Sequence, residues 1–144
     1  MTKPKLYLAQ TDTTAGLLSQ DLARLNLAKA RPASKPCLIT LPDFARLREI
    51  AKAPVAHRRR IRASKKTTYL YPNGTAARVV NNGAHQKFLS RLGWAFSSSA
   101  NRHGDKFDES FAKSVADEVV SERLFEGEAS SMFRLSRTRL RRLR

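Results

Sequence analysis

Cysteine pairs, long apolar runs and acidic side chains are all scarce in this sequence. Its 144 residues include a single cysteine, Cys37, so no internal disulfide is expected. No apolar run approaches the ~20 residues that a membrane-spanning helix needs. The apolar stretch at residues 6–9 is too short for the core of a signal peptide. We therefore expect a cytoplasmic protein, with Cys37 as a small buried side chain rather than a nucleophile.

Several chemical motifs are also missing. The chain contains no GxxxxGK[ST], GxGxxG or GxSxG segment. His57, His85 and His103 lack metal-ligand spacing to one another or to Cys37, so no protein-bound metal is expected. Asp12 is the one carboxylate in the hydroxyl-rich turn at residues 11–16. It fits an Asx-turn or helix cap and also a general base, and both interpretations stay open.

The charge is strongly one-sided. Against 28 Lys and Arg stand only 12 Asp and Glu, which gives a formal net charge of +16. Such an excess indicates polyanionic partners such as RNA, DNA or nucleotides. Basic, solvated helix faces would produce the same composition, and charge alone does not separate the two explanations.

Helical and strand patterns alternate along the chain, which predicts an α/β fold in one domain spanning residues 1–144. Asn73-Gly74 between two β-type runs predicts a hairpin, so the sheet should be mixed. Residues 132–144 alternate too loosely to type. The expected strands are residues 6–9, 37–41, 67–71, 75–80, 94–96 and 118–120, and the expected helices are residues 21–30, 42–53, 55–63, 84–92 and 108–116.

Two polar segments together predict a site for nucleotide phosphates. Lys29, Arg31 and Lys35 lie in a proline-bounded stretch of eight residues, and Ser97-Ser-Ser-Ala-Asn101 places three hydroxyls and an amide in five. Cations neutralise phosphate oxygens, whereas hydroxyls and amides orient them. Each segment alone is equally typical of a solvated helix end or a polar loop. Their joint occurrence favours a phosphate site without a Walker loop.

These segments also resemble motifs of the YrdC-like family of threonylcarbamoyl-AMP synthases. Residues 11–16, T-D-T-T-A-G, are similar to the family's T-[DE]-T-x-Y-G, and residues 29–36, K-A-R-P-A-S-K-P, to its K-x-R-P-x-x-[KN]-P. Residues 77–79, A-R-V, resemble A-V-R, and residues 97–101 with Gly104 resemble S-x-S-A-N-x-S-G. Weaker echoes at residues 130–132 and 140–141 extend the resemblance over residues 6 to 141.

The resemblance implies a twisted α/β sheet forming an open barrel around a basic cavity. It implies an enzyme that joins L-threonine, bicarbonate and ATP into threonylcarbamoyl-AMP and releases pyrophosphate, with Mg²⁺ accompanying ATP. The product would serve threonylcarbamoyladenosine modification of tRNA, together with a transferase machinery. By position, the implied ATP-binding residues are Lys29, Arg31, Lys35, Ser99, Asn101 and Arg141, and the implied threonine-binding residues are Thr11, Arg78, Ser97 and Ser130.

The chain departs from the family pattern at several places. Ala15 replaces the family's tyrosine, Gln10 its leading proline and His103 the last serine of its S-x-S-A-N-x-S. Residues 62–66 replace its W-P-G-P. A trimmed active enzyme and a trimmed protein that binds without catalysis both remain open.

The runner-up function is a non-catalytic RNA-binding or RNA-maturation module that uses the same basic cavity. Its RNA-contacting residues would be Arg58, Arg59, Arg60, Lys65 and Lys66. Tyr69 and Tyr71 would stack on bases or belong to the core. The basic tail at about residues 134–144, with six Arg and no acid, would contact tRNA or be a frayed solvated end.

Overall fold

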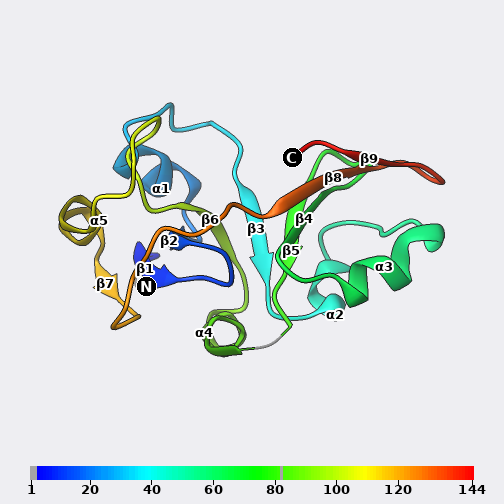
Figure 1. Ribbon diagram of the computed structural model, residues 1–144, viewed down its shortest axis with the longest axis horizontal. Coiled ribbons are helices and arrows are strands. Elements are labelled where there is room, and N and C mark those ends of the chain that lie inside the picture. Colours follow the sequence, from blue (N-terminus) through cyan, green and yellow to red (C-terminus); the bar gives the residue numbers. More distant parts are fainter. Residues whose placement is uncertain (1–2, 82) are drawn as a thin grey trace. The chain divides into compact units, whose positions relative to one another are not determined.

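The computed structural model describes residues 3–81 and 83–144, which fold as two compact units. Unit 1 is built from the chain up to Cys37 together with Ala95–Ala129, and unit 2 from Leu38–Trp94 together with Ser130–Arg144. The fold is mixed α/β, as the sequence predicted (Figure 1). None of the described helices is long and apolar enough to cross a membrane.

Unit 1 contains a short mixed sheet with strand order β7-β1-β2-β6. β1 pairs antiparallel with β2 and parallel with β7, and β2 pairs antiparallel with β6. Its core gathers apolar side chains from the strands and both helices, Leu8, Leu17, Leu25 and Ala112 among them. The elements are β1 (Tyr7–Gln10), β2 (Ala15–Ser19), α1 (Leu22–Ala28), β6 (Ala95–Ser99), α5 (Glu109–Val115) and β7 (Glu118–Val119).

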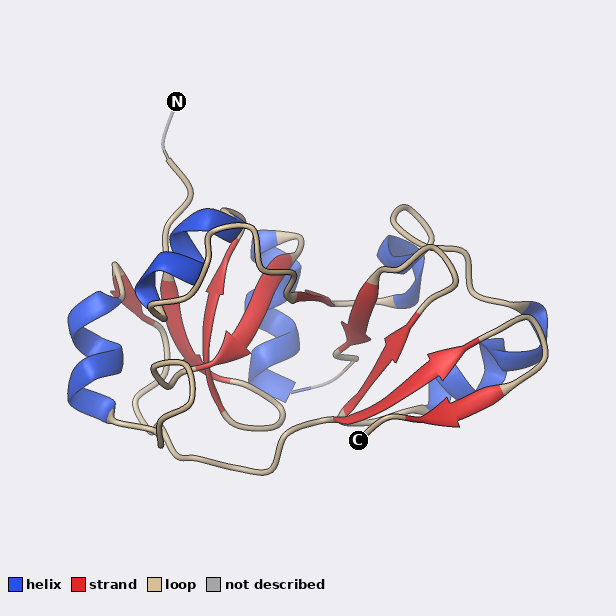
Figure 2. Ribbon diagram, turned by 90° about the horizontal axis from the view of Figure 1, so that it is seen from above, coloured by secondary structure: helices blue, strands red, loops and turns tan. Residues whose placement is uncertain are grey.

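Unit 2 contains strands in the order β3-β5-β4-β8-β9, again with both parallel and antiparallel pairs. Leu41, Leu47, Ile61, Tyr69 and Leu135 belong to its core. The helices and strands can be followed by type in Figure 2. The elements are β3 (Leu38–Leu41), α2 (Phe44–Leu47), the 3₁₀ turn η1 (Val55–His57), α3 (Arg58–Ala63), β4 (Thr67–Leu70), β5 (Ala76–Val79), α4 (Gly83–Leu92), β8 (Ser131–Leu135) and β9 (Leu140–Arg142).

Aspartates define where three helices begin. The carboxylates of Asp21, Asp43 and Asp108 accept hydrogen bonds from the backbone N–H three residues later, at 3.2, 2.8 and 3.2 Å. Each bond satisfies an N–H that has no partner within its helix. Local chemistry therefore fixes the starts of α1, α2 and α5.

The predicted hairpin turn is confirmed. Gly74 has φ of +87°, a conformation that glycine adopts without steric cost. Tyr71 N–H donates to Thr75 O at 2.8 Å and Gly74 N–H to Tyr71 O at 2.9 Å, so the turn joins antiparallel β4 and β5. This hairpin lies beside the parallel pair β3–β5, which makes the strands of unit 2 mixed.

Four segments differ from the sequence-based expectation. The helix expected over residues 42–53 is only the four-residue α2, Phe44–Leu47. Residues 15–19, part of which we expected as a turn, form β2 with all five residues buried. β6 continues through the serines to Ser99, rather than ending before them. The basic tail is not frayed, because β8 and β9 pair as a hairpin with Arg134 opposite Arg141.

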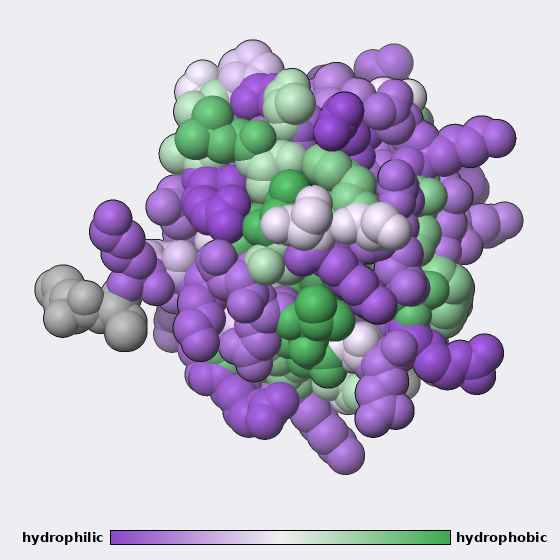
Figure 3. Space-filling view, turned by 90° about the vertical axis from the view of Figure 1, so that its left-hand side faces the viewer, coloured by the Kyte–Doolittle hydropathy of each residue, from purple (hydrophilic) through white to green (hydrophobic). Residues whose placement is uncertain are grey.

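The face of the molecule shown in Figure 3 carries mostly hydrophilic side chains, with small apolar patches between them. In unit 1 the exposed large apolar residues include Leu27, which is 66% exposed. Leu27 points to solvent because Leu25 and Asn26 form the buried side of this helix.

Candidate nucleotide site and its surroundings

The two segments predicted to bind phosphate meet in unit 1. Lys29 directly follows α1 and is 2% exposed. Its ammonium donates to the backbone oxygen of Ser99 and lies 3.4 Å from both Ser99 Oγ and Asn101 Oδ1. Residues 70 positions apart in the sequence are thus joined directly by one side chain.

Burial changes the ionisation of Lys29. Burial and, to a smaller extent, the positive charge of Arg31 together lower the pKa of the ammonium to about 8. The side chain is therefore largely charged below pH 8 and largely neutral above it. An ammonium that titrates near pH 8 therefore lies beside Ser99, at the end of β6.

The turn after β6 is held by Asn101. Ser99 Oγ donates to Asn101 Oδ1, and Asn101 Nδ2 donates to the backbone oxygens of Arg102 and Asp105, both at 2.9 Å. Ala100 N–H donates to Ala15 O at 2.8 Å, which attaches this turn to β2. Ser99 is exposed and Asn101 is half-buried, so the turn presents a hydroxyl and an amide at the surface of unit 1.

A buried asparagine organises the cationic loop. Asn26, fully buried on α1, donates to the backbone oxygens of Ala33 at 3.0 Å and Lys35 at 2.8 Å. Its Oδ1 accepts from Arg31 Nε at 2.7 Å. Sequence analysis missed Asn26, although its position four residues after Leu22 placed it on the apolar face of the helix.

Cys37 lies at the end of the same loop. It is half-buried, and Arg31 Nη2 donates to its Sγ at 2.8 Å. Burial raises the pKa of the thiol, while the positive charge of Arg31 opposes that shift. Cys37 is therefore a hydrogen-bond acceptor that orients Arg31, beyond the small apolar side chain that we expected.

The two predicted threonine contacts of unit 1 are Thr11 and Ser97. Thr11 Oγ1 accepts from the N–H groups of Thr13 at 3.1 Å and Thr14 at 3.2 Å, and donates to Thr14 O at 2.7 Å. This hydroxyl closes its own turn. Ser97 is buried on β6 opposite Leu18. The threonine-binding roles of Thr11 and Ser97 stay predictions.

Three predicted site residues belong to unit 2. Arg78 is buried on β5 opposite Thr40. Ser130 is buried, and its Oγ lies 2.7 Å from Thr68 Oγ1 and accepts from Arg144 Nη2 at 2.8 Å. Arg141 is exposed on β9. Within unit 2, the structure thus connects Ser130 with Thr68 and Arg144, two residues that the sequence did not single out.

The predicted RNA-binding cations lie on and after α3. Arg59, Arg60, Lys65 and Lys66 are exposed, whereas Arg58 is half-buried and donates from Nε to Ala53 O at 3.2 Å. Tyr69 and Tyr71, the nearest aromatic residues along the chain, are only 3% and 2% exposed. They are core residues, so they offer no stacking surface for bases.

Within residues 3–81 and 83–144, no group of three or more His, Cys, Asp or Glu side chains lies close enough to hold a metal ion. His57 is buried and its Nε2 lies 3.0 Å from Ser136 O. His103 contributes its backbone N–H, which donates to Lys29 O at 3.1 Å. That bond adds a further link between the two predicted phosphate segments.

Comparison of the sequence with family models and with curated proteins finds no match. Comparison of the structure finds solved proteins of the same fold. Sua5 from P. abyssi, solved as a double variant, superposes with a TM-score of 0.78 at 20% identity, over 97% of this chain and 52% of that one. P. abyssi Sua5 complexed with L-threonine gives 0.74 at 20% identity, over 97% of this chain and 50% of that one.

A third neighbour is close to this chain in length. E. coli YciO superposes with a TM-score of 0.74 at 15% identity, over 98% of this chain and 82% of that one. The chain itself spans about half the length of the Sua5 chains. Identities this low establish the fold alone. The order of strands and helices described above is accordingly the YrdC-like fold of Sua5 and YciO.

Proposed function

We propose that this chain binds ATP and L-threonine and forms threonylcarbamoyl-AMP, for threonylcarbamoyladenosine modification of tRNA. The direct contact of Lys29 with Ser99 and Asn101 is the observation that carries the proposal. It joins the two segments that resemble the ATP-binding motifs of the YrdC-like family. The solved complex of Sua5 with L-threonine, which has the same fold, supports threonine as a substrate.

The reaction needs positioned charge rather than a covalent nucleophile. The threonine amine attacks bicarbonate and water leaves, which gives a carbamate. A carbamate oxygen then attacks the α-phosphorus of ATP while the bond to the β-phosphate oxygen breaks. Pyrophosphate leaves with the electron pair of that bond, and the new P–O bond completes the mixed anhydride.

The proposed roles follow from the chemistry of each side chain. Lys29, Arg31 and Lys35 neutralise phosphate oxygens, while Ser99 and Asn101 orient them by hydrogen bonds. Mg²⁺ would accompany ATP without ligands from the protein. Arg141 is a further proposed ATP contact, and the proposed threonine contacts are Thr11, Arg78, Ser97 and Ser130.

The decisive measurement is pyrophosphate release by the purified protein. We expect release from ATP only when L-threonine and bicarbonate are both present, with the mixed anhydride detected by mass spectrometry. Release that ignores threonine, or no release under any of these conditions, would reject the synthase function.

Asn101→Ala and Arg59→Ala provide the matched comparison in that assay. Asn101 holds the turn against Lys29, whereas Arg59 is an exposed cation of unit 2 outside the proposed site. Loss of a charge-assisted hydrogen bond weakens ATP binding more than about tenfold in Asn101→Ala. Arg59→Ala should bind ATP like the parent.

The second candidate function is a non-catalytic RNA-binding module. The charge of unit 2 favours it, because this unit holds 18 of the 28 Lys and Arg but only 2 of the 12 Asp and Glu. Tight RNA binding together with no pyrophosphate release in any substrate combination would support it over the synthase.

A further inference from the structure

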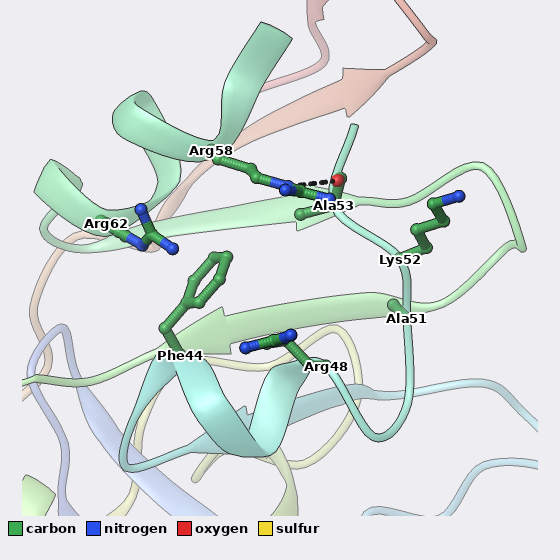
Figure 4. A pocket seen from close by; sticks show the side chains of 7 residues that line it. All are labelled: Phe44, Arg48, Ala51, Lys52, Ala53, Arg58 and Arg62. Atoms are coloured by element: carbon green, nitrogen blue, oxygen red, sulfur yellow. Dashed lines mark hydrogen bonds between the residues drawn. The ribbon is translucent and has the colours of Figure 1, made fainter. Parts of the chain in front are cut away.

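A polar pocket opens between the two short helices of unit 2. It has a volume of about 440 Å³, within the roughly 300–1,000 Å³ that small-molecule sites occupy. Figure 4 shows Phe44 of α2, Arg48 directly after that helix, and Arg58 and Arg62 of α3 around a common space. None of these residues belongs to the proposed ATP or threonine contacts. The lining is Phe44, Arg48, Ala51, Lys52, Ala53, Arg58 and Arg62.

Two of the guanidinium groups are held in place. Arg58 Nε donates to Ala53 O at 3.2 Å, which leaves its terminal nitrogens for other partners. The guanidinium carbon of Arg62 lies 4.5 Å from the centre of the Phe44 ring, a cation–π contact. A guanidinium held by such contacts loses less conformational entropy when it binds a ligand.

The charge of this pocket is not neutralised by the protein. Its four cationic lining residues form no ion pair with any carboxylate of residues 3–81 and 83–144. Unit 2 has only two acids, and Asp43 is already used, since it caps α2 and pairs with Arg46 at 3.8 Å. The other, Glu49, is exposed. Four like charges around one cavity repel one another, and a bound anion relieves that repulsion.

We propose that this pocket is a second anion site, which takes a phosphate group held by Arg48, Arg58 and Arg62. Guanidinium groups suit this ligand because their planar donors match phosphate oxygens at two points. Lys52 adds a point charge, although its side chain extends away from Phe44 in Figure 4. A free phosphorylated molecule and the backbone of an RNA both supply this group.

The test uses the full chain labelled with ¹⁵N, and inorganic phosphate as the first probe. The backbone amide signals whose chemical shifts change and then saturate during the titration should belong mainly to residues 44–53 and 58–62. The pocket variant Arg48→Gln/Arg62→Gln removes two cations that line the cavity. It should raise the Kd for phosphate more than about tenfold, because each lost charge-assisted contact is large.

The matched control is Arg59→Gln/Arg60→Gln. It removes the same number of charges, in this case from two exposed residues of α3 that do not line the pocket. Its Kd for phosphate should stay within about threefold of the parent. Equal weakening in both variants, or shifts spread evenly over all basic segments, would overturn the proposal.

A short RNA duplex is the second probe and identifies the source of the phosphate. Weaker RNA binding by the pocket variant than by the control assigns the site to polynucleotide backbones. Equal RNA binding, with phosphate binding still selectively lost, assigns it to a free phosphorylated ligand. If thermal melting shows that the double variant is unfolded, the single variant Arg48→Gln replaces it and is judged by the same criteria. Arg48 is exposed, so its loss should not unfold the protein.

Discussion

At the scale of single residues, Lys29 shows how burial and function act on one side chain. The fold removes this ammonium from water and surrounds it with oxygen acceptors from Ser99 and Asn101. Removal from water disfavours the charged form, so its pKa falls to about 8. A bound polyphosphate would reverse that preference, because negative charge stabilises the ammonium.

This coupling predicts that ATP affinity falls as pH rises through about 8. Below that pH Lys29 is already charged, whereas above it ATP must bind together with a proton. The phosphates of ATP change little in this range, because a phosphate monoester has its second pKa near 6. Titration calorimetry between pH 7.5 and 9.5 should show affinity falling roughly tenfold or more.

Lys29→Arg is the control, because arginine stays charged over the whole range. It should flatten the pH dependence even if its absolute affinity is lower. Parallel pH profiles for the parent and Lys29→Arg would show that another group titrates.

At the scale of elements, the loop at residues 29–37 depends on α1 through one amide. Asn26 holds the backbone at Ala33 and Lys35 and orients Arg31. The loop therefore derives its shape from a helix that begins at an aspartate cap and buries Asn26 beside Leu25.

We predict that Asn26→Ala destabilises the protein by about 1–3 kcal/mol, because it removes a buried amide that donates to the carbonyl groups of Ala33 and Lys35 and accepts from Arg31. Urea denaturation measures this loss. Asn81→Ala is the comparison, since Asn81 is exposed and the hydrogen bond from its side-chain amide to Arg62 O is long at 3.4 Å. It should change the free energy of unfolding by less than about 0.5 kcal/mol. Similar losses in the two variants would show that Asn26 does not support the loop.

Elements with local signals were predictable, and those that depend on distant partners were not. Aspartate caps and the Asn73-Gly74 turn act within a few residues, so α1, α5, the start of α2 and the β4–β5 hairpin were found. β2 was missed because it is buried on both faces and includes Gly16, so no alternation marks it. β8 and β9 have no glycine turn between them and carry arginines instead.

The same difference between local signals and distant partners applies to the residues of the candidate site. The motif resemblance predicted that Lys29 and Asn101 act together, and the two side chains do lie in contact. Asn26 and Arg144 went unnoticed, because their roles come from bonds to Arg31 and Ser130 that no spacing rule describes. The shared roles of Arg78 and Ser130 toward threonine remain a prediction from the resemblance.

At the scale of the whole molecule, the net charge of +16 belongs to one unit. Unit 1 has ten Lys and Arg against ten Asp and Glu, whereas unit 2 has 18 against two. The sequence alone hides this division, because each unit combines two separate stretches of chain. Nonspecific attraction to polyanions should therefore come from unit 2.

The salt dependence of RNA binding tests this partition. In a plot of log K against log salt, each phosphate contact contributes a slope of roughly −0.7 to −0.9. We expect Lys65→Gln/Lys66→Gln/Arg137→Gln, all exposed in unit 2, to flatten the slope by up to about 2–3. The equally charged change Lys3→Gln/Lys106→Gln/Arg123→Gln, in unit 1, should leave the slope near that of the parent. Equal flattening by both variants would mean that the whole surface attracts RNA.

The interleaving of the two units also has a consequence for synthesis on the ribosome. β2 of unit 1 gains its second partner strand only when β6 has been made, since Leu18 lies opposite Ser97. β4 of unit 2 likewise waits for β8, because Thr68 lies opposite Met132. The β1–β2 and β4–β5 hairpins can form as they emerge from the ribosome. The β2–β6 and β4–β8 pairs form only late in translation. At about 5–20 residues per second, both nascent units present open strand edges for several seconds.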